Sequence, residues 1–98
     1  MRHSFRFISD IGHGWLEVPV DLLWELDMVD AISRFSYLSP TWSKAYLEED
    51  CDAPKLVEEL KKRGHKPEIN YLDIDGDWHG RWKYARYSPE LVREHAIY

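Results

Sequence analysis

Apolar and polar residues alternate over residues 5–8 and again over residues 15–18. Alternation puts successive side chains on opposite faces of an extended chain, so each segment is expected to form a half-buried strand. Between them, Gly12-His13-Gly14 permits a turn with a positive φ angle. The pattern therefore predicts an antiparallel hairpin near the start of the chain.

The spacing of apolar residues becomes helical after Pro19. Three leucines between residues 22 and 26 share one face of a helix. This spacing predicts a helix over residues 20–27, and residues 28–32 either extend it or form a short turn.

The clearest helical pattern follows an acidic segment in the middle of the chain. Asp52 stands where an N-cap side chain would accept hydrogen bonds from the first backbone N–H groups. Gly64 stands where a left-handed residue ends a helix. The predicted helix therefore covers residues 53–63. Its apolar face is formed by Leu56, Val57 and Leu60.

Two further hairpins are expected. Residues 34–38 and 44–47 have strand-like patterns on either side of the turn Ser39-Pro40-Thr41. Residues 67–72 and 78–87 flank Asp75-Gly76, a dipeptide typical of type I′ hairpin turns.

A short C-terminal helix completes the expected fold, because Ser88-Pro89-Glu90 has the residue order of a helix start and predicts a helix to about His95. The order of elements predicts an α+β fold. It consists of a small antiparallel sheet of hairpins, two main helices packed on one face, and the short last helix.

Composition limits the class of protein. Ninety-eight residues form one domain, residues 1–98, in which 73–98 could be an added hairpin and tail. The formal charge of −5 argues against a duplex-DNA binder, which needs a basic surface. One cysteine excludes an intrachain disulfide and fits a reducing compartment. Because neither a signal peptide nor a bilayer-spanning run of apolar residues is found, a cytoplasmic protein without membrane contact is expected.

Two acidic segments are candidate binding sites, Glu48–Asp52 and Asp73–Asp77. The segment Asp73–Asp77 resembles half of a calcium loop, but Trp78 and Tyr84 occupy the positions where that loop needs glycine and glutamate. Five histidines are scattered at spacings that present no two ligands from one element, so no metal site and no cofactor are predicted.

Catalytic motifs are not found, and the chain is predicted not to be an enzyme. Cys51 lies among carboxylates, which disfavour the thiolate that a nucleophile needs, and is interpreted as a core or cap residue. A hydrolase that uses carboxylates or histidines is a further alternative hypothesis. Support for it would have to come from a turnover assay.

Basic and aromatic residues alternate over residues 81–87, and such a strand could stack on bases and contact phosphates. Packing of its rings in the core is the simpler interpretation. If the strand binds a small ligand or nucleotide, the predicted ligand-binding residues are His13, Trp15, Arg81, Lys83 and Arg86.

Two blocks of sequence carry a resemblance, GHGWLEVP at residues 12–19 and YLEEDCDA at residues 46–53. Over about residues 3–72 the chain resembles a family of short proteins, without a settled activity, that phages, prophages and other mobile elements encode. It differs in having Asp27 where a helix-ending glycine is usual, and in residues 73–98. The resemblance implies expression in the host cytoplasm and, by analogy with small acidic phage proteins, the blocking of a host factor such as a CRISPR effector.

The first functional hypothesis is therefore a non-enzymatic protein that inhibits a host defence complex, anti-CRISPR in type. Its partner would be a host protein or ribonucleoprotein with a basic groove, and a homodimer is left open. The predicted partner-binding residues are Glu48, Glu49, Asp50, Asp73, Asp75, Asp77, Trp42 and Trp78. The alternative hypothesis is a protein that sequesters a small ligand or nucleotide.

Overall fold

The computed structural model describes residues 2–10, 12–73 and 83–95. These residues form six strands, three α-helices and one short 3₁₀ helix, η1. In chain order the elements are β1 (Arg2–Asp10), β2 (His13–Pro19), α1 (Val20–Glu25), η1 (Val29–Ala31), β3 (Tyr37–Leu38), β4 (Lys44–Glu48), α2 (Ala53–Lys62), β5 (Lys66–Asp73), β6 (Ala85–Arg86) and α3 (Pro89–His95).

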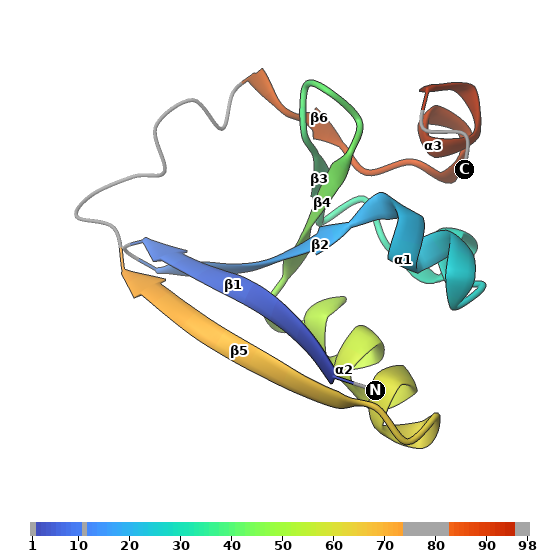
Figure 1. Cartoon of the computed structure of the whole chain (residues 1–98). Helices are drawn as coiled ribbons and strands as arrows, with labels where there is room; N and C mark the ends of the chain where they lie inside the picture. Colours follow the sequence, from blue (N-terminus) through green and yellow to red (C-terminus); the bar gives the residue numbers. More distant parts are fainter. Residues whose placement is uncertain (1, 11, 74–82, 96–98) are drawn as a thin grey trace.

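The six described strands form one sheet in the order β5-β1-β2-β4-β3-β6 (Figure 1). The first two predicted hairpins are present, since β1 pairs with β2 and β3 pairs with β4 in antiparallel fashion. However, β5 pairs with β1 in parallel. The α+β class is therefore confirmed, whereas the sheet is mixed and not wholly antiparallel. β5 follows β4 through the helix α2. Parallel strands require such a crossover, because a tight turn cannot join them.

The third predicted hairpin is wrong. β5 and β6 lie at opposite edges of the sheet, and β6 pairs with β3. The Asp75-Gly76 turn and residues 78–82 of the predicted strand 78–87 lie outside the described residues. Tyr87 accounts for the position of β6, because its backbone N–H donates to Ser36 O at 2.8 Å and its hydroxyl donates to Val29 O at 2.6 Å.

Helix α1 ends earlier than the leucine spacing predicted. Asp27 adopts a φ angle of 56°, the left-handed conformation that glycine usually takes after a helix. The chain then forms the short helix η1, so the short-turn alternative for residues 28–32 is correct. The longest described helix, α2, has ten residues. Among the described residues no helix is long and apolar enough to cross a membrane.

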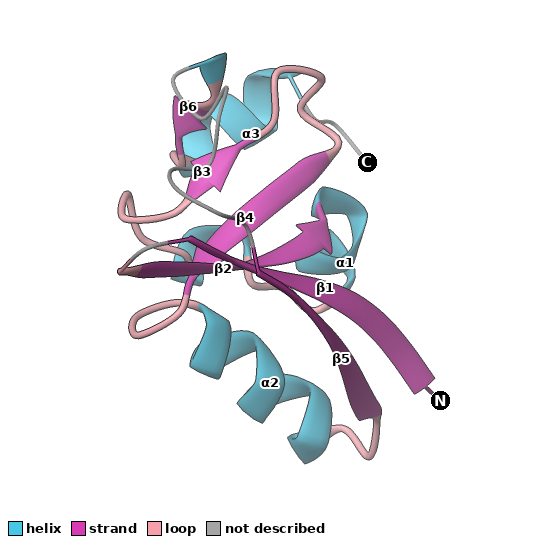
Figure 2. Ribbon diagram, turned by 90° about the vertical axis from the view of Figure 1, so that its left-hand side faces the viewer, coloured by secondary structure: helices cyan, strands magenta, loops and turns pink. Residues whose placement is uncertain are grey.

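The main hydrophobic core lies between the sheet and its helices. Alternate strand residues such as Leu16 and Leu47 join Leu23 of α1 and Leu56 of α2 in one buried cluster. The C-terminal segment contributes its buried Val92 to the same cluster, and Figure 2 shows α3 beside β3 and β6. The segment 83–95 is therefore an integral part of the core. The opposite face of the sheet carries a smaller cluster, formed by Ile8, Trp15 and Tyr46.

Candidate functional site

Three strands of the sheet end at the same edge and bring acidic residues there. β1, β4 and β5 run in the same direction, because β1 and β4 are both antiparallel to β2 and β5 is parallel to β1. Ser9 pairs with Asp73 on one side and Gly14 on the other, and Glu49 N donates to Gly14 O at 3.1 Å. Asp73 and Glu49 are thus three strand spacings apart, about 14 Å.

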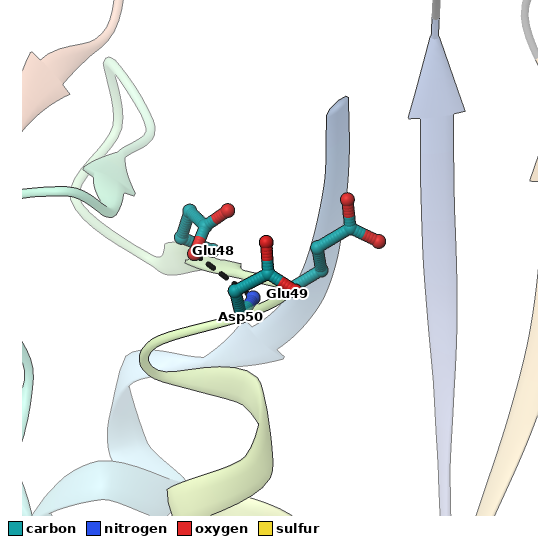
Figure 3. Close-up of side chains that lie close together, drawn as sticks. All are labelled: Glu48, Glu49 and Asp50. Carbon is teal, nitrogen blue, oxygen red and sulfur yellow. Dashed lines mark hydrogen bonds between the residues drawn. The ribbon is translucent and has the colours of Figure 1, made fainter. Parts of the chain in front are cut away.

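Glu48, Glu49 and Asp50 form the densest part of this acidic edge (Figure 3). One carboxylate oxygen from each residue lies within 4.8 Å of the other two. Glu48 Oε1 accepts hydrogen bonds from the backbone N–H groups of Asp50 and Cys51, both at 2.9 Å, so this carboxylate holds the turn after β4. The side chains of Glu49 and Asp50 are therefore the better candidates for contact with a partner.

Asp52 does not have the role predicted from sequence. It precedes α2, but its side chain makes no capping hydrogen bond to the helix. Its carboxylate is fully buried and accepts hydrogen bonds from Ser33 N at 3.1 Å, from Ser33 Oγ at 2.7 Å and from Ser36 Oγ. It therefore ties α2 to the segment that connects η1 with β3.

That segment borders the pocket that best combines the predicted site residues. The pocket has a volume of about 460 Å³, within the range of about 300–1,000 Å³ common for small-molecule sites. It is lined by His13, Trp15, Phe35, Tyr37, Glu48, Asp50, Cys51 and Arg86.

Aromatic rings make one continuous part of the pocket lining. His13 stacks on Trp15 with 6.1 Å between ring centroids, and Trp15 meets Tyr37 edge-on at 5.2 Å. The guanidinium carbon of Arg86 lies 4.7 Å from the centre of the Tyr37 ring, in cation–π geometry. Phe35 is 54% exposed although it is large and apolar. Phe35 is therefore a large apolar side chain of the pocket that a partner can contact.

Cys51 lies at the surface of the pocket, which corrects its interpretation as a core or cap residue. Desolvation and the neighbouring carboxylate of Glu48 raise the pKa of the Cys51 thiol. A raised pKa reduces the thiolate fraction at neutral pH, so this environment suits binding better than nucleophilic chemistry.

The predicted partner-binding residues separate into three groups. Glu48, Glu49 and Asp50 lie together, and Asp73, whose carboxylate accepts from Ser9 Oγ at 2.5 Å, lies across the sheet edge. Trp42 is at the other end of β4, half-buried against the core and stacked on a histidine of α3, and is therefore a poor anchor for the same partner. Three residues lie outside the described part of the chain: Asp75, Asp77 and Trp78.

The alternative ligand-binding set is brought together in part. His13, Trp15 and Arg86 line the same pocket. Lys83 is exposed and does not line it, and Arg81 lies outside the described residues. The pocket also contains Phe35 and Tyr37, which sequence reasoning missed, because their segment was interpreted as one strand of ordinary sheet packing.

Comparison with known proteins adds no family. No protein-family model, no curated protein and no solved structure matches this chain. The resemblance to phage-encoded proteins therefore stays a prediction from the two sequence blocks.

Proposed function

We propose that this chain is a non-enzymatic binding protein that docks its acidic sheet edge on a basic surface of a host defence complex and inhibits it. The observation that supports this best is that residues from the predicted partner-binding set and from the predicted ligand-binding set line one pocket. Glu48 and Asp50, expected to contact a partner, line the same pocket as His13, Trp15 and Arg86. Carboxylates beside aromatic rings suit an arginine or lysine side chain of a partner.

Exposed charges of this kind act mainly on the rate of association and on partner choice. Neutralising Glu49 and Asp50 together, as Glu49→Gln/Asp50→Asn, should slow association with a CRISPR-type ribonucleoprotein about three- to tenfold at 50 mM NaCl. Glu48 is left unchanged because it holds the turn. The measurement is biolayer interferometry on a panel of such complexes at 50 and 500 mM NaCl.

A matched control removes the same charge elsewhere. Glu58 of α2 and Glu94 of α3 are both exposed, so Glu58→Gln/Glu94→Gln should associate at nearly the wild-type rate. Equal slowing in both double variants would show a general charge effect. A dissociation constant that is the same at both salt concentrations would contradict the electrostatic mechanism, because exposed charges are screened at high salt.

A small-ligand function is the second candidate, and the pocket volume of about 460 Å³ favours it. Glu48 and Asp50 in the lining oppose a phosphate group. We therefore expect an uncharged or cationic aromatic compound to bind better than a nucleotide. Calorimetry with each nucleoside beside its 5′-monophosphate tests this, and the absence of heat with both classes would remove the candidate.

A further inference from the structure

β5 lies at one edge of the described sheet, where its only neighbour among the described strands is β1 (Figure 1). An edge strand presents a row of backbone N–H and C=O groups that can pair with another chain. Its start carries Lys66 and Pro67, residue types that discourage such pairing, whereas residues 69–72 contain neither proline nor charge. The second half of β5 is therefore the part of this edge that is suited to pairing.

Exposed apolar side chains lie in the same half of the strand. Tyr71 is 74% exposed and Leu72 is 45% exposed, and among the described residues only Phe35 is a comparably exposed large apolar side chain. A cavity of about 400 Å³ lies beside them where α2 meets the sheet, and its mainly apolar lining includes Val57 and Ile69. Apolar surface next to the backbone of an edge strand is typical of sites where a strand of another chain is added.

The charges at the two ends of β5 favour a second copy of this chain as that partner. Residues 61–66, which lead into β5, hold three lysines and one arginine and no acid. The opposite end of the strand is Asp73, which is exposed. A second β5 in antiparallel orientation would bring the basic end of each copy to the acidic end of the other. A parallel orientation would oppose like charges, so β5 is complementary to an antiparallel copy of itself.

Symmetry restricts the register of such a pair. A two-fold axis perpendicular to the sheet keeps each face on its own side, so the residues opposite each other are both odd or both even. With Asn70 on the axis, Ile69 of each copy lies opposite Tyr71 of the other, on the face where α2 packs. Such aliphatic–aromatic pairs stabilise a sheet. Pro67 then lies opposite Asp73 at the end of the pairing, where its missing N–H is tolerated. A shift by two residues would place Pro67 opposite Tyr71, or Ile69 opposite Asp73.

We propose that two copies of this chain form a dimer by antiparallel pairing of β5 with β5, centred on Asn70. The Tyr71 ring of each copy would cover Ile69 of the other and the open side of the cavity beside α2. The two sheets would then be joined at the edge opposite β6. The inference does not rest on the proposed function, because it needs only β5 and the part of α2 beside it.

Sedimentation velocity over a range of protein concentrations measures the dimerisation. The wild type should form dimers with a dissociation constant of about 100 μM or lower. Tyr71→Lys places a cation opposite Ile69 and should weaken dimerisation by at least about tenfold. Phe35→Lys is the matched control and should dimerise as the wild type does, because Phe35 is also large, apolar and exposed but lies outside β5. Circular dichroism of both variants checks that they fold.

The charge argument is tested by measuring two variants separately and then mixed. Lys66→Glu and Asp73→Lys should each weaken dimerisation about three- to tenfold at 50 mM NaCl, because each opposes like charges across the pair. An equimolar mixture should regain the wild-type affinity, because one copy then has acids at both ends of β5 and the other has bases at both ends.

Cross-linking with a short bismaleimide tests the register. In the variant Cys51→Ser/Asn70→Cys the two thiols should face each other across the axis, with Cβ atoms about 4.5–5.5 Å apart, and the two chains should be linked. The wild type, whose only thiol is Cys51, should not be linked, because seven strand spacings, about 33 Å, separate the two copies of β4.

Four results would overturn the proposal. The first is a wild type that stays monomeric at about 1 mM. The second is a Tyr71→Lys protein that dimerises as tightly as the wild type. The third is a mixture of the two charge variants that associates no more tightly than each variant alone. The last is cross-linking through Cys51 as efficient as cross-linking through Asn70→Cys.

Discussion

Replacing Asp52 by alanine is expected to destabilise the protein by about 3–5 kcal/mol, the usual cost of removing one partner from a buried charged network. The carboxylate is fully buried, and the donors around it come from two segments. Ser33 and Ser36 donate from the segment before β3, and Lys55 Nζ donates from α2 at 2.9 Å. Alanine would leave buried donors without an acceptor and detach α2 from that segment.

Substitutions of the residues that donate to Asp52 measure how much each hydrogen bond of the network contributes to stability. Lys55→Ala should cost no more than about 1 kcal/mol, because nearly half of the lysine side chain is exposed. Ser36→Ala should cost about 1–3 kcal/mol, because the Ser36 hydroxyl also accepts the backbone N–H of Glu48, at 3.0 Å, and that donor would be left unpaired. Urea denaturation of the variants at pH 7 measures all three values.

The effect of Asp52 should also depend on pH. Burial raises the pKa of Asp52, but hydrogen bonds from Ser36, Ser33 and Lys55 outweigh it and lower the pKa from its ordinary value of 3.8. The folded protein therefore favours the charged form, and this stabilisation is fully present above pH 3.8 and decreases as the pH falls below it. The difference between wild type and Asp52→Ala should narrow from pH 7 to pH 3. An equal difference at both pH values would contradict the charged network.

Asp52 also shows what the sequence can predict at this site. Its place immediately before a helix is visible locally, and α2 does begin at Ala53. Its partners are 16 and 19 residues away, in a segment whose serines have no distinctive spacing. Local pattern therefore locates the residue, but the role of its side chain depends on a tertiary contact that no local pattern contains.

Some strand pairs of the sheet could likewise be predicted from local sequence, and others could not. Hairpins β1–β2 and β3–β4 were predictable because their turns carry glycine or proline between alternating segments. The positions of β5 and β6 depend on partners distant in sequence, so a turn dipeptide between them misled the prediction. The pocket contains residues of both kinds. His13 and Trp15 lie in the first hairpin, which local pattern predicts, whereas Arg86 joins them only because β6 pairs with β3.

Replacing Tyr87 by alanine is expected to cost about 4 kcal/mol, similar to other deletions of a buried aromatic ring. The side chain is only 2% exposed, and its hydroxyl donates to Val29 O at 2.6 Å in the interior. It follows β6 directly and joins the C-terminal segment to the core that α1 and α2 share. The loss would therefore weaken the attachment of both β6 and α3.

Tyr87→Phe separates the hydrogen bond from the packing. The ring remains, and Val29 O loses its buried donor, so the expected cost is about 1–2 kcal/mol. Tyr71 supplies a matched control, because it is 74% exposed at the end of β5. Tyr71→Phe should change stability by less than about 0.5 kcal/mol. Urea denaturation at pH 7 gives these values, and hydrogen exchange over residues 83–95 reports whether the segment has detached.

The buried hydroxyl of Tyr87 should also make the stability of the protein depend on pH above neutrality. Burial, followed by the charge of Asp30, raises the pKa of Tyr87 above its ordinary value of 10.0. The folded protein therefore retains the proton that the unfolded chain loses, and wild-type stability should fall as the pH rises above 10.0, with a smaller fall in Tyr87→Phe. The difference in the free energy of unfolding between the wild type and Tyr87→Phe should thus narrow between pH 9 and pH 11.

The prediction for Tyr87→Ala has a contradicting outcome of its own. A Tyr87→Ala protein with a free energy of unfolding within about 1 kcal/mol of wild type, and with unchanged hydrogen exchange over residues 83–95, would show that this segment is held by contacts other than the ring.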